Sequence, residues 1–118
     1  MHELAAARAL IEEALRACSK KGIKNPYKIE AELGAITTYK KEPIKFYYGI
    51  LKAEYPLFEK TRLGIKTVPG KLRCNECGKV TVIKKPQLIL CQKCGSTDVR
   101  ITAGREFNIT RIIRRKSI

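Results

Sequence analysis

The sequence predicts an α+β fold, in which two helices pack on a three-stranded sheet and a cysteine-rich module is inserted before the last strand. Two stretches repeat apolar residues at helical spacing, and three others alternate apolar and polar residues. Two cysteine pairs stand ahead of the last alternating stretch. We therefore expect one α+β domain formed by residues 1–70 plus 104–118, and a second, cysteine-based domain over residues 71–103.

The two helical segments differ in how clearly their ends are marked. Residues 3–21 begin with Glu3, whose charge suits the positive end of a helix dipole, and Gly22 follows as a C-terminal cap. The second helix is expected to begin at Pro43, which suits a first turn, and to end at Pro56. The apolar stripe of the first helix comprises Leu4, Ala7, Ile11, Ala14, Leu15 and Cys18, and that of the second comprises Ile44, Tyr47, Ile50 and Leu51.

Three segments have the alternation of half-buried strands. The first covers residues 27–33 and ends at Gly34, and the second covers 63–67 and is stopped by Pro69-Gly70. The last is marked by Phe107, Ile109 and either Ile112 or Ile113. Together they predict one three-stranded sheet that carries both helices on one face.

Some apolar side chains allow two interpretations. Cys18 belongs to the helical stripe, which favours a small buried hydrophobe over a reactive thiol. Phe46, Tyr47 and Tyr48 could form a base-stacking platform, but helical spacing favours core positions.

The chain is strongly basic, with 25 Lys and Arg against 11 Asp and Glu, giving a net charge of +14. Residues 71–118 hold 12 basic and 3 acidic side chains, against 13 and 8 in residues 1–70. Such a charge suits nucleic acid or an acidic protein partner, although the cations are scattered enough for a generally solvated surface. No apolar run approaches the roughly 18 residues of a membrane span, and charges interrupt the first segment, so we expect a cytoplasmic protein without a signal peptide.

The cysteine pairs have the spacing of a metal site. Cys74 and Cys77 form one C-x2-C pair, Cys91 and Cys94 form another, and each pair is followed by glycine. Four thiolates suit tetrahedral Zn²⁺ and leave no open coordination position, so the site is expected to be structural. Iron in a rubredoxin-like site is the alternative metal. The apolar residues on either side of Lys84-Lys85-Pro86 predict a hairpin between the pairs, and the fold class becomes two helices on a three-stranded sheet with an inserted zinc-ribbon module.

The amino terminus offers a second metal site. The α-amine of Met1 becomes a nitrogen ligand when it loses its proton, and His2, the only histidine of the chain, adds an imidazole. Together with the intervening amide nitrogens they suit square-planar Ni²⁺ or Cu²⁺. By itself the motif is weak, because a histidine at position 2 also arises by chance.

In combination, these features resemble the HypA family of hydrogenase nickel-incorporation proteins. The resemblance covers nearly the whole chain and is carried by Met1-His2-Glu3-Leu4 before an amphipathic helix, by the paired C-x2-C-G motifs, and by Gly104-Arg105-Glu106 before the last strand. It implies a nickel metallochaperone that delivers Ni(II) as transient cargo to the precursor of the nickel–iron hydrogenase large subunit, or to urease in some organisms. It also implies the GTPase HypB as a partner.

Carried over by residue, the resemblance assigns the sites. The nickel ligands would be the Met1 amine and His2, with the carboxylate of Glu3 orienting or gating the site. The structural Zn(II) would be held by Cys74, Cys77, Cys91 and Cys94.

Two other function classes compete with this interpretation. A basic zinc-ribbon protein that binds nucleic acid would explain the charge directly, but not His2 or Gly104-Arg105-Glu106. An enzyme is the weakest alternative, because a closed tetrathiolate zinc activates no water and no second histidine exists for acid–base chemistry. We therefore expect a non-catalytic carrier with weak, non-specific nucleic-acid contacts at most.

Overall fold

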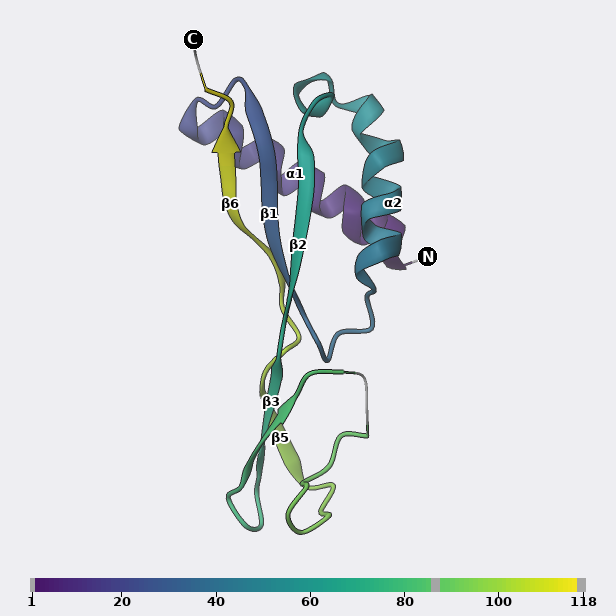
Figure 1. Ribbon diagram of the computed structural model, residues 1–118, viewed down its shortest axis with the longest axis vertical. Helices are drawn as coiled ribbons and strands as arrows, with labels where there is room; N and C mark the ends of the chain where they lie inside the picture. Colours follow the sequence, from purple (N-terminus) through teal and green to yellow (C-terminus); the bar gives the residue numbers. More distant parts are fainter. Residues whose placement is uncertain (1, 86–87, 117–118) are drawn as a thin grey trace. The chain divides into compact units, whose positions relative to one another are not determined.

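The computed structural model describes residues 2–85 and 88–116, and its elements follow the predicted order (Figure 1). The helices are α1 (His2–Lys21) and α2 (Lys41–Leu51), and two short 3-10 turns follow them, η1 (Lys52–Glu54) and η2 (Pro56–Phe58). The strands are β1 (Pro26–Gly34), β2 (Arg62–Val68), β3 (Gly70–Cys74), β4 (Val80–Ile83), β5 (Val99–Ala103) and β6 (Phe107–Arg114). Among the described residues, neither helix combines the length and the apolar character that crossing a membrane demands.

The chain divides into two compact units. The first comprises the described parts of residues 1–32, 39–66 and 108–118, and the second comprises residues 33–38 and the described parts of 67–107. The first unit contains the sheet β2-β1-β6, and the second contains the sheet β4-β3-β5. The predicted fold class is confirmed, because both helices belong with the three strands that the alternation predicted, and the cysteine module interrupts the chain before β6. The assignment of one metal function to each domain stays a prediction at this point.

The core of the first unit lies between the helices and one face of its sheet. α1 lies behind the strands in Figure 1 and α2 lies beside them. Alternate residues of β1, Ile29 and Ala31, are buried against the helices, as the period of a strand requires. The other buried apolar side chains of this core include Ala7, Leu10, Ile11, Ala14, Cys18, Ile44, Tyr48, Leu51, Phe58, Leu63 and Ile65. Each fully buried large side chain contributes roughly 1.5–3 kcal/mol relative to exposure.

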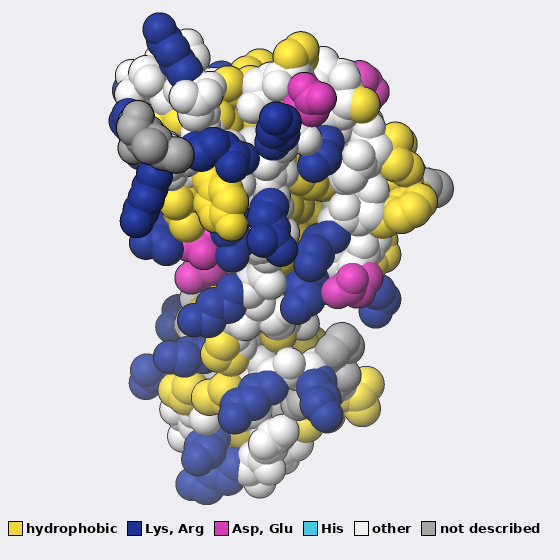
Figure 2. All heavy atoms as spheres, turned by 45° about the horizontal axis from the view of Figure 1, so that its top comes forward, with side chains coloured by type: hydrophobic (Ala, Val, Ile, Leu, Met, Phe, Trp, Pro, Cys, Tyr) yellow, Lys and Arg dark blue, Asp and Glu magenta, His cyan; other side chains and the backbone are white. Residues whose placement is uncertain are grey.

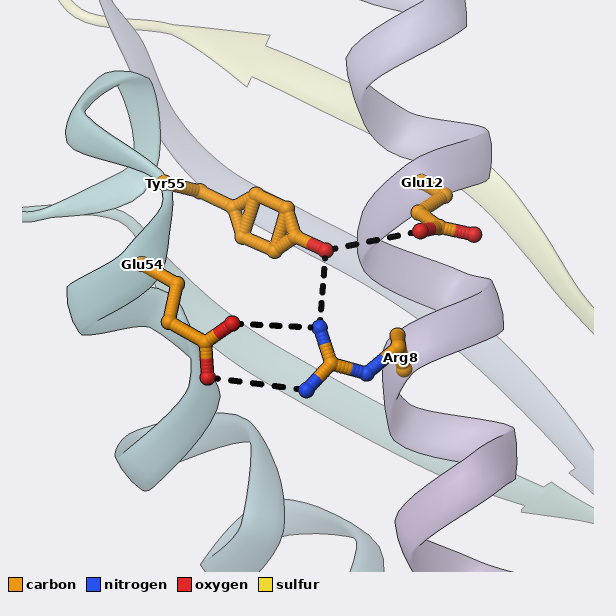
Figure 3. Close-up of polar contacts among 4 residues, drawn as sticks. All are labelled: Arg8, Glu12, Glu54 and Tyr55. Atoms are coloured by element: carbon orange, nitrogen blue, oxygen red, sulfur yellow. Dashed lines mark hydrogen bonds and ion pairs between the residues drawn. The ribbon is translucent and has the colours of Figure 1, made fainter.

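Polar contacts fix α1 against the end of α2 and η1 (Figure 3). The guanidinium of Arg8 donates to both carboxylate oxygens of Glu54, at 3.2 and 3.5 Å, and to the hydroxyl of Tyr55 at 3.2 Å. The same hydroxyl donates to Glu12 at 3.5 Å, one helical turn after Arg8. These groups are partly exposed, so the network defines the position of α1 more than it adds to the free energy of unfolding.

The predictions for the end of the second helix and for its aromatic residues are only partly right. α2 ends at Leu51 and the chain continues as 3-10 turns, so Pro56 begins η2 rather than closing the α-helix. Cys18 is 1% exposed, which confirms its place in the core, and burial raises the pKa of its thiol. Tyr48 is buried as expected, whereas Phe46 is 64% exposed because it lies on the outer side of α2.

The predicted hairpin between the cysteine pairs is wrong. β4 pairs with β3, with Lys71 opposite Val82 and Leu72 opposite Thr81, and no strand is present at residues 88–90. β3 is the central strand because β5 pairs with its other edge. Neither β3 nor β5 is predicted from the sequence, and both partners of β3 come from later in the chain. The tip of the predicted hairpin, residues 86–87, lies outside the described residues.

Two glycines allow a close chain crossing within the second unit. A Cβ on Gly34 would overlap the carbonyl group of Gly104, and Gly104 itself has a positive φ of 109°. The crossing is held by hydrogen bonds from the amide of Gly34 to the carbonyl of Glu106 at 2.7 Å and from that of Ile36 to the carbonyl of Gly104 at 2.8 Å. The carboxylate of Glu106 accepts from the Gly104 amide at 2.6 Å. The Gly104-Arg105-Glu106 motif is therefore a structural element that directs the chain into β6.

Candidate metal centre

The four cysteines of the two pairs come together in the second unit. Their sulfur atoms all lie within 4.8 Å of one another, and the Cys74–Cys94 and Cys77–Cys91 sulfurs are 3.6 Å apart. Cys74 and Cys91 are buried, whereas Cys77 and Cys94 are exposed. Among residues 2–85 and 88–116, this is the one group of three or more His, Cys, Asp or Glu side chains arranged to hold a metal.

The two cysteine turns have the same local geometry. In the first, the amide of Gly78 donates to the carbonyl of Cys74 at 3.0 Å, and in the second, Gly95 donates to Cys91 at 2.8 Å. Both glycines have φ of 77°, which residues with a Cβ rarely adopt. Each turn thereby directs both of its cysteine side chains toward one point.

Hydrogen bonds that do not involve the sulfur atoms hold the two cysteine turns in place. Asn75 donates to Asp98 twice, from its amide to the carbonyl at 3.0 Å and from its side chain to the carboxylate at 2.9 Å. The amide of Gln92 donates to the hydroxyl of buried Thr81 on β4 at 3.5 Å. These contacts were absent from the sequence predictions, because the residues are 23 and 11 positions apart and carry no motif of their own.

Backbone amides stabilise negative charge on the sulfurs. Donation from the Cys94 amide, followed by that of Lys93 at 3.4 Å, lowers the pKa of Cys91 to about 6. The amide of Cys77, 3.4 Å from the Cys74 sulfur, likewise lowers the pKa of Cys74. The Ser96 amide favours the thiolate of Cys94, but the thiols of Cys74, Cys91 and Cys77 act against it, and together with desolvation they raise its pKa to about 12. The full tetrathiolate therefore needs a cation to neutralise its charge.

The arrangement fits zinc. Four sulfurs bonded to a tetrahedral Zn²⁺ at about 2.3 Å lie about 3.8 Å from one another, close to the distances found here. Four thiolates fill the coordination sphere, so the centre is structural and leaves no position for a substrate or an activated water.

The predicted amino-terminal site is only partly within the described residues. Met1 lies outside them, and His2 is exposed as the first residue of α1. Glu3 is half-buried, and its carboxylate accepts a hydrogen bond at 3.3 Å from the amide of Lys40, immediately before α2. No pattern in the sequence indicates this contact, because it joins residues 37 positions apart. The nickel ligands stay a prediction.

Comparison with known proteins is consistent with this centre and this fold. A family model described as "Hydrogenase/urease nickel incorporation, metallochaperone, hypA" matches residues 1–113. The chain is 35% identical over 109 residues to the hydrogenase maturation factor HypA of Moorella thermoacetica, covering 92% of this chain and 95% of that protein. It is 30% identical over 118 residues to the hydrogenase maturation factor HypA of Methanothermobacter thermautotrophicus, covering 95% of each.

Solved structures agree at the level of the fold. The solution structure of the nickel metallochaperone HypA from Helicobacter pylori superimposes with a TM-score of 0.68 at 21% identity, covering 93% of this chain and 94% of that one. A second solution structure, of a HypA protein, gives a TM-score of 0.69 at 22% identity, with 98% and 97% covered. The family match over residues 1–113 confirms the resemblance found in the sequence, and this chain belongs to the HypA family of hydrogenase and urease nickel-incorporation metallochaperones.

Proposed function

We propose that this chain binds Ni(II) at its amino terminus and carries it to the precursor of a nickel–iron hydrogenase, or to urease. The observation that carries the proposal is the exposure of His2 at the start of α1, in a family defined by nickel incorporation. The ligands in this proposal are the α-amine of Met1 and the imidazole of His2, with the intervening backbone nitrogen. Nitrogen donors of this kind suit the square-planar geometry that Ni(II) accepts.

The start of a helix is a favourable place for such a site. The first amides of a helix have no carbonyl partner within it, so one of them can exchange its proton for a metal without breaking a helical hydrogen bond. The positive end of the helix dipole repels the cation, and the negative charge of Glu3 opposes that repulsion.

The surrounding contacts hold the ligands without enclosing them. The carboxylate of Glu3 accepts from the Lys40 amide at 3.3 Å, which attaches the first turn of α1 to the start of α2. Arg8 attaches the next turns of α1 to Glu54 and Tyr55. The first turns of α1 are thereby held against α2 and η1, while His2 is exposed to solvent and to a partner. Such a site can release its ion quickly, which a carrier needs and an enclosed tetrathiolate does not provide.

The proposal includes the partners that the family resemblance implied. Nickel would pass to the large-subunit precursor of the hydrogenase with the help of the GTPase HypB, and the chain itself would catalyse no reaction. A reducing cytoplasm suits the four metal-binding thiolates, which an oxidising compartment would convert to disulfides.

The experiment is a nickel titration of chains with altered amino termini. His2→Ala and a two-residue Gly-Ser extension before Met1 should each lose stoichiometric Ni(II) binding, because the first removes the imidazole and the second removes the α-amine from its position. A Gly-Ser extension after Ile118 is the matched control and should bind nickel normally. Zinc content and circular dichroism should be the same in all variants. Unchanged nickel affinity in both amino-terminal variants would exclude this site.

A further inference from the structure

Basic side chains gather at the end of the first unit where β6 finishes, on the face shown in Figure 2. Here a hollow of about 190 Å³ has cations from three separate segments on its rim. Lys24 follows α1, Lys60 follows η2, and Arg115 follows β6. The nickel site proposed above uses none of these residues.

The arginine is held in place by the backbone around it. The amide of Arg115 donates to the carbonyl of Asn25 at 2.7 Å, and its guanidinium donates to the carbonyl of Lys60 at 3.2 Å. The guanidinium also lies 5.3 Å from the ring centre of Tyr27. These contacts bring three distant segments together and fix one positive charge at the rim before any ligand arrives.

Among the residues that the structure describes, the three rim cations form no ion pair. The ion pairs among the described residues involve Arg8, Lys28 and Arg111, and none includes a residue of this rim. Glu59 lines the hollow but forms no ion pair with another described residue. By contrast, nearby Arg114 donates to the carbonyl of Lys21 at 3.2 Å, so its charge is offset at the negative end of α1. The hollow therefore has three cations against one carboxylate, and an anionic group would neutralise this excess of positive charge.

The residues that line the hollow indicate which kind of anion it binds. They include Pro26, Pro56 and Leu57, which suit the methylene groups of a peptide side chain. A volume of about 190 Å³ corresponds to roughly six waters, enough for one carboxylate side chain. A nucleic acid is a poorer match, because Arg115 covers the ring of Tyr27 that could otherwise stack on a base.

We propose that this hollow, the basic hollow, binds a carboxylate side chain from an acidic segment of a protein partner. The positive field of the first unit attracts the segment, and the fixed guanidinium of Arg115 gives the carboxylate one position. Lys24 and Lys60 are exposed, and no contact of their side chains is found among the described residues, so both can turn toward the ligand.

The test uses a labelled octaglutamate peptide at about 50 mM salt, where charge interactions are only weakly screened. The variant Lys24→Glu with Lys60→Glu reverses two rim charges and leaves the backbone contacts of Arg115 intact. The matched control, Lys45→Glu with Lys84→Glu, makes the same change in net charge at exposed residues that do not line the hollow. We expect the rim variant to weaken peptide binding by about tenfold or more, and the control by about threefold or less.

Two further measurements distinguish an acidic peptide from a nucleic acid as the ligand of the basic hollow. Amide chemical shifts of the unaltered chain on addition of octaglutamate should change most at residues 24–25, 57–60 and 115. An oligothymidylate of eight nucleotides should bind more weakly than the peptide. Equal losses in the rim and control variants, no peptide binding at all, or shifts centred elsewhere would overturn the proposal. Tighter binding of the oligonucleotide, lost in the rim variant, would make the basic hollow a nucleic-acid site instead.

Discussion

At the scale of single residues, two buried hydroxyl groups connect three segments of the first unit. The hydroxyl of Tyr48 on α2 donates to the carbonyl of Thr61 at 2.7 Å, and the hydroxyl of Thr61 donates to the carbonyl of Pro26 at 2.7 Å. Tyr48 is 4% exposed and Thr61 is fully buried. Each hydroxyl donates to a backbone carbonyl in a buried position, where leaving a polar group without its partner costs about 1–3 kcal/mol.

We expect Tyr48→Phe to reduce the free energy of unfolding by about 1–2 kcal/mol at neutral pH, because the Thr61 carbonyl loses its donor. The effect should shrink in alkali. Burial raises the pKa of Tyr48 above its ordinary value of 10, so the folded chain keeps a proton that the unfolded chain loses. The contribution of Tyr48 to the free energy of unfolding is therefore fully present below pH 10 and is lost as the pH rises further.

The measurement is urea unfolding of the unaltered and Tyr48→Phe chains at several pH values around 10. The other tyrosines and the lysines titrate alike in both chains, so their effect cancels in the difference between the two unfolding free energies. A difference in unfolding free energy that stays constant across this range would show that Tyr48 titrates alike in both states.

At the scale of elements, the second unit depends on very little apolar surface. Apart from its metal-site cysteines, the large apolar side chains fully buried in the β4-β3-β5 sheet are Leu72 and Ile83. Two such side chains contribute roughly 3–6 kcal/mol, which is small against the entropy of ordering these strands and turns. The tetrathiolate metal site must therefore supply much of the folding free energy of this unit.

Replacing Cys74 with Ser, or Cys94 with Ala, should release zinc and unfold the segment near residues 71–103, while α1 and α2 persist. Cys18→Ala is the matched control, because it removes a buried thiol outside the cluster and should leave the zinc content unchanged. Metal analysis together with amide exchange of that segment tests both expectations. Full protection of residues 71–103 in a metal-free chain would show that the strands fold without the ion.

At the scale of the whole molecule, the net charges of the two folded units differ from those of the two parts of the sequence. Along the sequence the positive excess is larger in residues 71–118, at 12 basic against 3 acidic side chains. Residues 108–118 belong to the first unit, however, and bring Arg111, Arg114, Arg115 and Lys116 with them. The first unit then holds 17 basic and 8 acidic residues, or +9, and the second holds 8 and 3, or +5. The unit proposed to bind nickel is also the more basic one.

A salt series should separate the roles of this charge. Binding to duplex or single-stranded nucleic acid is expected to be weak and to disappear between about 50 and 200 mM salt, because it depends on counterion release. Nickel affinity should barely change over the same range, since the ligands lie within bonding distance of the ion. Sequence-selective nucleic-acid binding that survives physiological salt and is unaffected by His2→Ala would favour the basic zinc-ribbon interpretation over the carrier.

The sequence by itself determined the two helices, the three strands of the first unit and the four cysteines of the metal centre. Helical spacing located α1, alternation located β1, β2 and β6, and the two C-x2-C-G motifs identified the four cysteines whose sulfurs lie within 4.8 Å. These features are local: a few neighbouring residues decide whether a side chain is buried in a helix or a strand, or whether a turn directs two thiols to one point.

Only the tertiary structure decided which distant segments meet. It pairs β4 with β3 instead of residues 88–90, since alternation marks a strand but not its partner. It shows that a side chain at Gly34 would overlap the carbonyl group of Gly104, and that Lys24, Lys60 and Arg115 line one hollow. The β3–β4 pairs join residues 7 to 13 positions apart, and the other two contacts join residues at least 36 positions apart. The packing of the whole chain selects them, and no local pattern records that selection.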